Sequence, residues 1–116
     1  MVRLTLTFAA SGGESWRLLE ALRPVVVSTH PGHGCVGWTM SVSAESGLSP
    51  CLRYVEDWAT ERELRERVRS ESFPRLLAVM EAAHTPPRIV FELATGSRGL
   101  EFVEEARDQP VEPRLD

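Results

Sequence analysis

The chain has 116 residues, of which 42% are hydrophobic and 26% are charged, and these proportions are typical of a single globular domain. Its formal net charge is −4, so it lacks the basic field that binding to nucleic-acid phosphates requires. All 13 basic residues are arginine, and neither lysine nor asparagine occurs. A lysine Schiff base and an asparagine amide are therefore excluded from any catalytic site.

The sequence carries no recognisable targeting segment. No stretch reaches the ~18 apolar residues of a membrane-spanning helix, and residues 1–5 lack the basic start of a signal peptide. We therefore expect a cytoplasmic protein with no membrane partner. Cys35 and Cys51 are then expected to be reduced thiols. A disulfide between them is also disfavoured, because the predicted strand pairing separates them by more than about 20 Å.

The first half of the chain predicts a strand, a helix and a hairpin. Apolar and polar residues alternate over residues 2–9, which is the period of a half-buried strand. From Glu14 the apolar residues recur with helical spacing, and Pro24 lies off this apolar stripe. Residues 35–42 and 51–58 alternate again and are separated by turn residues, so they predict an antiparallel hairpin.

The second half predicts two helices and a further strand. Thr60 and Glu63 have the spacing of a capping box, which indicates the start of a helix. A new helix is expected from Ser70, with Pro74 tolerated in its first turn. Residues 88–93 then alternate as a fourth strand.

The end of the chain is less regular. Residues 96–99 predict a turn, while the periodicity of residues 100–107 is compatible with a short helix or an extended arm. Residues 109–116 contain two prolines and no core pattern, so we expect them to be disordered. The predicted domain therefore spans residues 1–98, followed by a C-terminal arm and tail over residues 99–116.

The predicted order is strand, helix, strand, strand, helix, strand, which is the ferredoxin-like βαββαβ plan of the α+β class. We expect a four-stranded antiparallel sheet with both helices on one face. We also expect the other face to carry apolar residues of its own, so that two subunits would pack sheet against sheet.

Three short segments follow one another at a spacing that is more specific than any of them alone. Residues 31–38 (PGHGCVGW) lead into the second strand, and residues 53–60 (RYVEDWAT) form a strand that ends in an acidic residue, a tryptophan and a capping threonine. Residues 70–73 (SESF) open the following helix. Together they resemble the antibiotic-biosynthesis monooxygenase family of the dimeric α/β-barrel superfamily, over about residues 2–95.

The resemblance implies a homodimer whose two sheets face each other as a barrel, with a pocket between helices and sheet in each subunit. Some relatives oxygenate phenols or quinols without metal or flavin, others degrade haem, and many have no known activity. Haem-degrading relatives have a tryptophan nine residues after the signature tryptophan and an iron-binding histidine four residues after the phenylalanine. These positions are Arg67 and Leu77 here, and leucine cannot bind iron, so we expect no haem and no other cofactor.

Arg67 and Tyr54 are the candidate catalytic residues. Arg67 stands where quinol-oxidising relatives tend to have a histidine, and a guanidinium there could stabilise a phenolate or an enolate that Tyr54 orients. The alternative is that Arg67 belongs to a solvated helix face, because residues 61–69 interleave both signs of charge. The sequence identifies no general base.

Four side chains are candidates for binding a ligand. They are Trp38, Trp58, Phe73 and Leu77. Ideal pairing about the turn puts Trp38 near Val55, while Tyr54 and Trp58 share one face of their strand. Aromatic walls suit a flat phenolic or quinone-like molecule. Simple core packing is the alternative explanation for the aromatic residues.

The three histidines offer weaker signals. His30, His33 and Cys35 are metal-ligand types, but their spacing matches no standard zinc site and no fourth ligand is evident. We therefore expect two exposed histidines in a loop and no bound metal. His84 follows a predicted helix, where a cation complements the C-terminus, and a general base at the pocket mouth is the alternative.

Two functions are compatible with the sequence. The first is a cofactor-independent, monooxygenase-like enzyme acting on a phenolic or quinol-type small molecule, whose deprotonated form would react with dioxygen directly. The second is a non-enzymatic homodimer of the same fold that binds a small aromatic ligand or serves as an interaction module. Both catalytic groups of relatives often use an asparagine, so the missing histidine and asparagine favour the second function.

Overall fold

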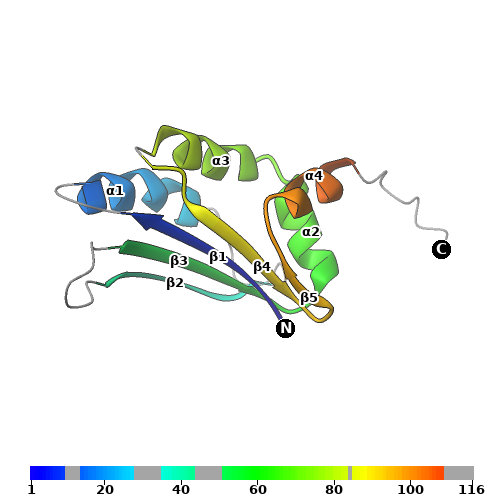
Figure 1. The fold of residues 1–116 in the computed structure, drawn as a ribbon. Helices are drawn as coiled ribbons and strands as arrows, with labels where there is room; N and C mark the ends of the chain where they lie inside the picture. The colour runs from blue at the N-terminus through cyan, green and yellow to red at the C-terminus, as the bar shows by residue number, and fades with distance from the viewer. Residues whose placement is uncertain (10–13, 28–34, 44–50, 84, 109–116) are drawn as a thin grey trace.

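The computed structural model of the protein describes residues 1–9, 14–27, 35–43, 51–83 and 85–108 (Figure 1). The strands are β1 (Val2–Ala9), β2 (Cys35–Ser43), β3 (Cys51–Trp58), β4 (Arg88–Leu93) and β5 (Gly96–Arg98). The helices are α1 (Glu14–Val27), α2 (Glu61–Arg69), α3 (Phe73–Ala82) and α4 (Glu101–Asp108).

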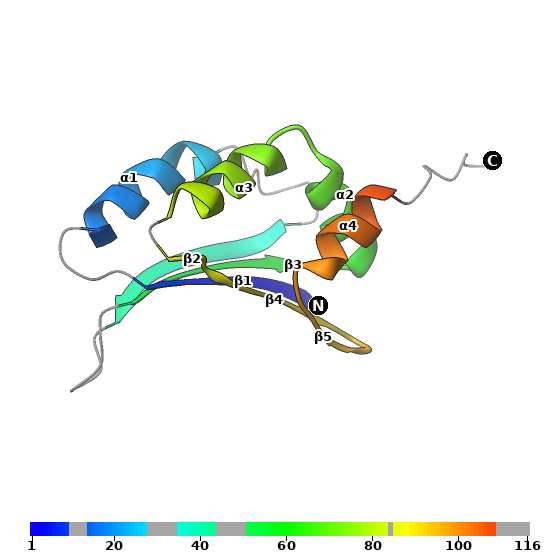
Figure 2. The same ribbon diagram turned by 45° about the horizontal axis from the view of Figure 1, so that its top comes forward.

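Within these residues the strands form one antiparallel sheet in the order β2-β3-β1-β4-β5. The four helices lie on one side of this sheet, with α1 and α3 along the strands and α2 and α4 at one end (Figure 2). The predicted α+β class and ferredoxin-like plan are confirmed, and the sheet gains a fifth strand, β5.

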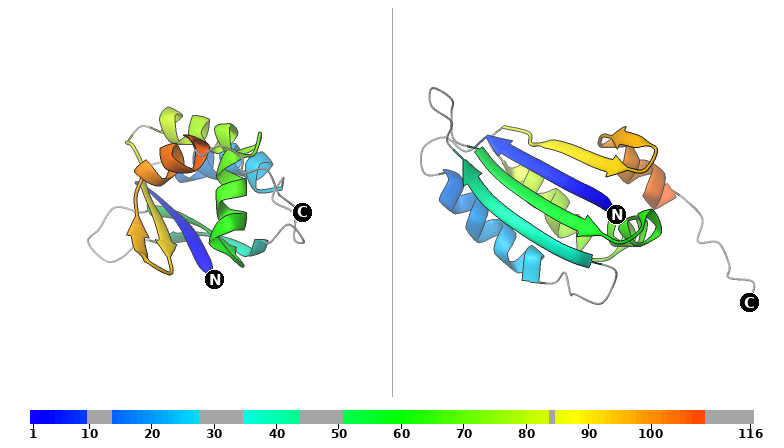
Figure 3. Two further views of the ribbon diagram at one scale, coloured as in Figure 1. Left: turned by 90° about the vertical axis from the view of Figure 1, so that its right-hand side faces the viewer. Right: turned by 90° about the horizontal axis from the view of Figure 1, so that it is seen from below.

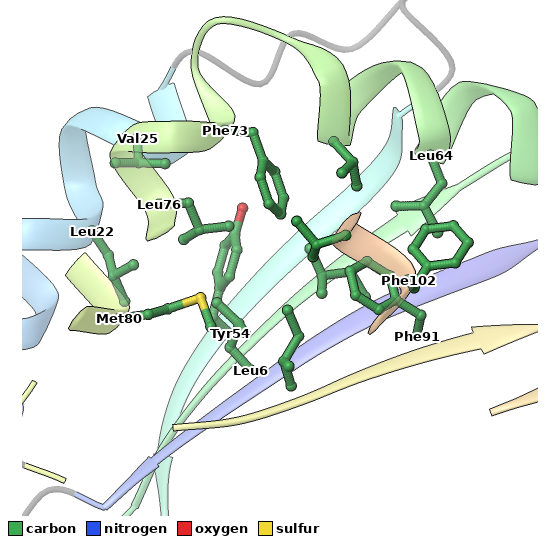
Figure 4. Close-up of a cluster of buried hydrophobic side chains, with 14 of the residues drawn as sticks. Leu6, Leu22, Val25, Tyr54, Leu64, Phe73, Leu76, Met80, Phe91 and Phe102 are labelled. Atoms are coloured by element: carbon green, nitrogen blue, oxygen red, sulfur yellow. The ribbon is translucent and has the colours of Figure 1, made fainter. Parts of the chain in front are cut away.

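The core lies between the sheet and the helices, as the alternation predicts. Even-numbered residues of β1 and β3 face the helices and are buried, because the period of a strand puts every second side chain on the same face. The largest fully buried side chains are Tyr54, Phe8, Phe73, Phe91 and Phe102, several of which are labelled in Figure 4. On α1, Pro24 is exposed and the helix continues past it to Val27, so the proline ends no helix here.

The hairpin register differs from the predicted one by one residue along most of its length. Cys35 pairs with Trp58 as ideal pairing predicts, but Trp38 pairs with Glu56 and not with Val55. The cause is a β-bulge between Cys35 and Gly37, which inserts one extra residue into β2. Trp38 therefore shares the helix-facing side of the sheet with Glu56.

The predicted start of α2 is confirmed, whereas α3 begins later than predicted. Thr60 is the N-cap of α2, and its hydroxyl accepts a hydrogen bond from the Glu63 amide at 3.2 Å. Ser70 ends α2 and does not begin the next helix, because its amide and hydroxyl both donate to the carbonyl of Arg67. The N-cap of α3 is Ser72.

The C-terminal segment is part of the same packed unit. The predicted turn at residues 96–99 is wrong, because Gly96–Arg98 forms strand β5 beside β4. The helix α4 resolves the open alternative at residues 100–107. Its Phe102 is fully buried, with its ring centroid 4.4 Å from that of Phe91 and beneath the Arg65 guanidinium at 4.7 Å. The domain boundary at residue 98 stays a prediction, although α4 shares the core of residues 1–98.

The right-hand view of Figure 3 shows the face of the sheet away from the helices, which we call the open face. The side chains that the strand alternation puts on this face are mostly polar. In β1, β3 and β4 its larger aliphatic side chains are Val55 and Val90, and charged or hydroxyl groups surround them. The prediction of a second apolar face is therefore wrong for these strands. The alternation Arg3, Thr5, Thr7 already shows this in β1.

None of the helices in the described part of the chain has both the length and the apolar character needed to cross a bilayer.

Replacing Phe102 with alanine should lower the free energy of unfolding by about 3–5 kcal/mol, because it leaves a cavity against Phe91. Urea denaturation followed by circular dichroism measures this change. Leu100→Ala is the matched control: this side chain lies at the start of the same segment but is exposed, so we expect a change within about 0.5 kcal/mol. Equal effects of the two variants would contradict the placement of α4 in the core.

Candidate functional site

A fully buried carboxylate, that of Glu56, lies at the centre of the helix-facing side of β3. Tyr54 and Trp58 flank it on the same strand face, two residues before and after it. The Tyr54 hydroxyl donates a hydrogen bond to Oε2 of Glu56, and the Trp58 indole nitrogen donates to Oε1 at 3.0 Å. An ionised carboxylate in this position needs further compensation, because burial away from water strongly disfavours its charge.

Arg67 of α2 supplies that compensation. Its Nε donates to Oε1 of Glu56 at 3.3 Å and its Nη2 donates to Oε2 at 3.1 Å, so the guanidinium binds both carboxylate oxygens in a bidentate ion pair. Only 4% of the Arg67 side chain is exposed, so its placement on a solvated helix face is wrong. Leu64 and Val68, three residues before and one after, are buried beside it, which defines the inward face of α2.

The turn between α2 and α3 completes the arrangement. The third nitrogen of Arg67, Nη1, donates to the Ser72 hydroxyl at 2.7 Å, and this hydroxyl lies 3.1 Å from that of Ser70. The guanidinium carbon also lies 5.5 Å from the ring centroid of Phe73, within the range of a cation–π contact. We call Glu56, Tyr54, Trp58, Arg67 and Ser72 together the Glu56 cluster.

The environment of the cluster changes the pKa of two of its groups. Burial raises the pKa of Tyr54 far above its ordinary value, and the neighbouring Glu56 carboxylate raises it further. Burial has the largest single effect on the pKa of Arg67 and lowers it, but the charge and hydrogen bonds of Glu56, together with the contribution of Tyr54, outweigh burial and raise this pKa. Tyr54 therefore stays a neutral donor and Arg67 stays a cation across the physiological pH range.

The structure brings most of the predicted site residues together. Tyr54, Trp58, Arg67 and Phe73 meet around Glu56, and Figure 4 shows Tyr54 rising from β3 towards Phe73. Leu77 is partly buried on α3 and packs against the core. Trp38 differs from the others, because it lies opposite Glu56 on the outermost strand and remains 44% exposed.

Sequence reasoning missed Glu56, although a signal for it was present. The alternation of Leu52, Tyr54, Glu56 and Trp58 puts the carboxylate on the apolar face of β3. A buried carboxylate predicts a buried cation, and that prediction would have favoured an inward Arg67.

The weaker predicted sites gain little from the structure. His30, His33 and His84 lie outside the described residues, and Cys35 is buried. Burial raises the pKa of the Cys35 thiol, which disfavours a thiolate nucleophile there. The described residues contain no group of three or more histidine, cysteine or acidic side chains that could hold a metal.

A hollow of about 280 Å³ lies near the start of β1. It is lined by Met1, Val2, Arg3, Asp57, Glu92 and Leu93. Arg3 and Asp57 form a bidentate ion pair in its wall, with distances of 2.7 and 3.2 Å. The hollow shares no lining residue with the Glu56 cluster, so the two are separate features.

Comparison with known proteins supports the fold. No protein-family model matches the chain, and no curated protein sequence does. A proposed antibiotic biosynthesis monooxygenase from Deinococcus radiodurans matches the structure with a TM-score of 0.62 at 18% identity, covering 81% of this chain and 92% of that one. A conserved protein from Methanosarcina mazei Go1 matches with a TM-score of 0.61 at 17% identity, covering 79% and 90%.

A third solved structure, of an antibiotic biosynthesis monooxygenase, matches with a TM-score of 0.57 at 16% identity and covers 78% of this chain and 95% of that one. The predicted resemblance is thus confirmed for the fold, which the chain shares with these solved structures. At these identities the residues of a site do not transfer, so the role of the Glu56 cluster must be argued from its own geometry.

Replacing Glu56 with glutamine should lower the free energy of unfolding by about 3–5 kcal/mol, because Arg67 then remains buried and charged without a counter-ion. The double variant Glu56→Gln with Arg67→Met should lose less free energy of unfolding than the sum of the losses in the two single variants. The reason is that the glutamine amide oxygen can still accept a hydrogen bond from Tyr54 or Trp58. Chemical denaturation of the four proteins gives this coupling energy.

The pair Glu66 and Arg62 is the matched control, because its side chains are exposed and 3.6 Å apart. The same cycle, Glu66→Gln with Arg62→Met, should give a coupling below about 0.5 kcal/mol. Coupling energies of similar size in both cycles would show that the buried ion pair contributes no more than an exposed one.

The single tyrosine of the chain, Tyr54, provides a pH test. Its pKa is raised by folding, so above pH ~10 the unfolded chain loses the phenolic proton and the folded chain keeps it. The free energy of unfolding should then fall by about 1.4 kcal/mol per pH unit. As the pH is raised, the ultraviolet absorbance of tyrosinate should appear only at the pH where circular dichroism shows that the chain unfolds. In the chain unfolded by urea, the phenol of Tyr54 should instead titrate near the ordinary pKa of tyrosine. Tyrosinate in a folded chain near pH 10 would contradict the burial of this hydroxyl.

Proposed function

We propose that the protein is a homodimeric, small-ligand-binding module of the monooxygenase-like fold, in which Arg67 and Tyr54 stabilise the fold and do not act on a substrate. One observation carries this proposal: the three nitrogens of Arg67 and the hydroxyl of Tyr54 all donate to groups within the chain. A phenolate could reach Arg67 only by entering the core, because only 4% of this side chain is exposed, and it would then compete with the buried Glu56 carboxylate for the cation.

Trp38 is the part of the aromatic group that a ligand can reach. It lies on β2 directly opposite Glu56, and nearly half of it is exposed, whereas Trp58, a member of the cluster, and Phe73, beside Arg67, are buried. Met40 is partly buried on the same strand face and packs against the core. A flat aromatic molecule stacked on the Trp38 indole would remove apolar area from water on both partners. We therefore assign ligand binding to the helix-facing side of β2.

A cofactor-independent monooxygenase acting on phenols or quinols is the second candidate. The likeness to a structure described as an antibiotic biosynthesis monooxygenase favours it. In this mechanism the deprotonated substrate gives an electron to dioxygen, so the protein must supply a base and a stabilising donor. Arg67 is the candidate donor and Tyr54 the candidate orienting group, and both would first have to leave Glu56.

Tryptophan fluorescence can test binding at Trp38. A panel of hydroquinones and simple phenols should quench the fluorescence of the parent protein saturably, and Trp38→Phe should abolish at least half of that quenching. Trp16→Phe is the matched control, because this residue is even more exposed, at 65%, and lies on α1. Equal loss in both variants would indicate collisional quenching and would remove the proposed site.

Oxygen consumption separates the two candidates. With the same hydroquinones we expect no oxygen uptake above the rate of the protein-free solution, for the parent protein or for Arg67→Ala. Saturable uptake by the parent that Trp38→Phe lowers and Trp16→Phe retains would overturn the proposal in favour of the monooxygenase.

A further inference from the structure

Among the described residues, one buried oxygen of the Glu63 carboxylate has no hydrogen-bond partner. Glu63 lies in the first turn of α2, where its backbone amide donates to the Thr60 hydroxyl, and this oxygen is its Oε2. A capping box would use one carboxylate oxygen for the Thr60 amide, and the other oxygen would still lack a partner. A buried acceptor without a donor is costly in free energy, so Oε2 of Glu63 is a candidate contact for a ligand.

The helical period places Glu63 on the flank of α2 that faces away from α4. Arg65 lies on the opposite flank, because it pairs with Glu105 of α4 at 3.2 Å. Each residue of a helix is rotated by about 100° from the one before it, so Glu63 and Arg65 lie on either side of the buried Leu64. Glu63 therefore shares its flank with Arg67, which follows about one turn later.

This flank of α2 faces the side of the sheet that carries β2. The helix α4 packs on β4, where the rings of Phe102 and Phe91 meet. Arg67 instead bonds to Glu56 of β3. Since the sheet order is β2-β3-β1-β4-β5, the direction from α4 to Arg67 continues towards β2. The left-hand view of Figure 3 shows the same arrangement, with the orange α4 on the side of α2 where β5 lies.

Trp38 lies next to this flank, on the helix-facing side of the sheet. It is opposite Glu56 on β2, and 44% of it is exposed. Glu63 lies one helical turn, or about 5.4 Å along the axis, from the arginine that binds Glu56. Because α2 begins shortly after β3 ends at Trp58, this turn leads towards the end of that strand. Trp38 and Glu63 therefore border the same part of the surface, with Glu56 between them.

The ion pairs of α2 leave Glu63 without a cation. Within the part of the chain that the structure describes, these pairs join Arg62 to Glu66, Arg65 to Glu61 and Glu105, and Arg67 to Glu56. The Glu56 cluster is neutral overall, because its carboxylate and its guanidinium carry opposite charges. Glu63 therefore adds an unbalanced negative charge to this flank, beside an exposed indole.

We infer that Glu63 is the polar anchor of the Trp38 site and that this site selects aromatic ligands that carry a protonated amine. The aromatic ring would stack on Trp38, while the ammonium group would donate to Oε2 of Glu63 and neutralise its charge. A cation is also attracted to the face of an indole, so both residues favour the same group. This inference rests on the binding at Trp38 proposed above and names the residue and the charge that select the ligand.

Three ligands with the same phenol ring test this charge preference. Tyramine carries an ammonium group, para-ethylphenol carries no charge at that position, and para-hydroxyphenylacetate carries a carboxylate. Isothermal titration calorimetry of the full chain at neutral pH gives the three dissociation constants. Tyramine should bind at least about 10-fold more tightly than para-ethylphenol, because its ammonium group adds a charge-assisted hydrogen bond. The carboxylate ligand should bind most weakly, because Glu63 repels it.

The variant Glu63→Gln keeps the size of the side chain and removes its charge. The dissociation constants of tyramine and para-ethylphenol should then agree within about 3-fold, and that of para-ethylphenol should stay as in the parent. Glu66→Gln is the matched control, because it makes the same charge change on the exposed side of the same helix. In this control the preference for tyramine should stay at least about 10-fold, since water and salt screen an exposed charge.

The outcomes separate the Trp38 site from the role of Glu63. If neither tyramine nor para-ethylphenol binds the parent, or if Trp38→Phe leaves their binding unchanged, the Trp38 site itself is overturned. If the two bind the parent equally and Trp38→Phe weakens both, the Trp38 site is retained and the role of Glu63 is overturned. Equal loss of the preference in Glu63→Gln and Glu66→Gln would also overturn that role, because it would assign the preference to the overall charge of the chain.

Discussion

The buried ion pair between Glu56 and Arg67 is the constraint on which the rest of the helix-facing side depends. A carboxylate that is fully buried must find a cation and further donors, because its charge cannot be solvated there. Tyr54 and Trp58 supply two donors from the same strand, and Arg67 must come from α2. The pair therefore fixes which face of α2 turns inward, and Ser72, which accepts from Arg67, fixes where α3 begins.

The value of such a pair lies more in specificity than in stability. Replacing a buried ion pair by apolar residues of similar size is often neutral or stabilising, so the presence of the pair is weak evidence for stability. The pair does disfavour other rotations of α2 about its axis. A rotation by one residue would move Arg67 by about 100° and leave both charges buried and unpaired. The C-terminal segment holds α2 from its other side, where Arg65 covers the ring of Phe102 and Arg107 donates to the Val68 carbonyl at 2.9 Å. The helix is thus held between the sheet and α4.

The sequence predicts the elements of this fold well, because its periodicity changes clearly between strands and helices. The strand at residues 51–58 and the start of α2 at Thr60 both follow from local patterns and both are confirmed. What local patterns miss depends on contacts between distant segments. The bulge near Val36 moves Trp38 from beside Val55 to beside Glu56, and the inward turn of Arg67 depends on a residue eleven positions earlier. The ambiguous segment at residues 100–107 is a helix because Phe102 has Phe91 to pack against, which its own spacing does not reveal.

The donors of Arg67 and Tyr54 are already bound to groups within the chain, and this limits where a ligand or a partner can bind. A site that uses Arg67 must break hydrogen bonds that the fold itself needs, so binding there would compete with stability. The exposed edge of β2 carries no such conflict, since Trp38 lies opposite Glu56 on the neighbouring strand and is 44% exposed. A ligand that stacks on Trp38 would leave the hydrogen bonds of the cluster in place, which is why a Trp38 variant tests binding without testing the stability of the core.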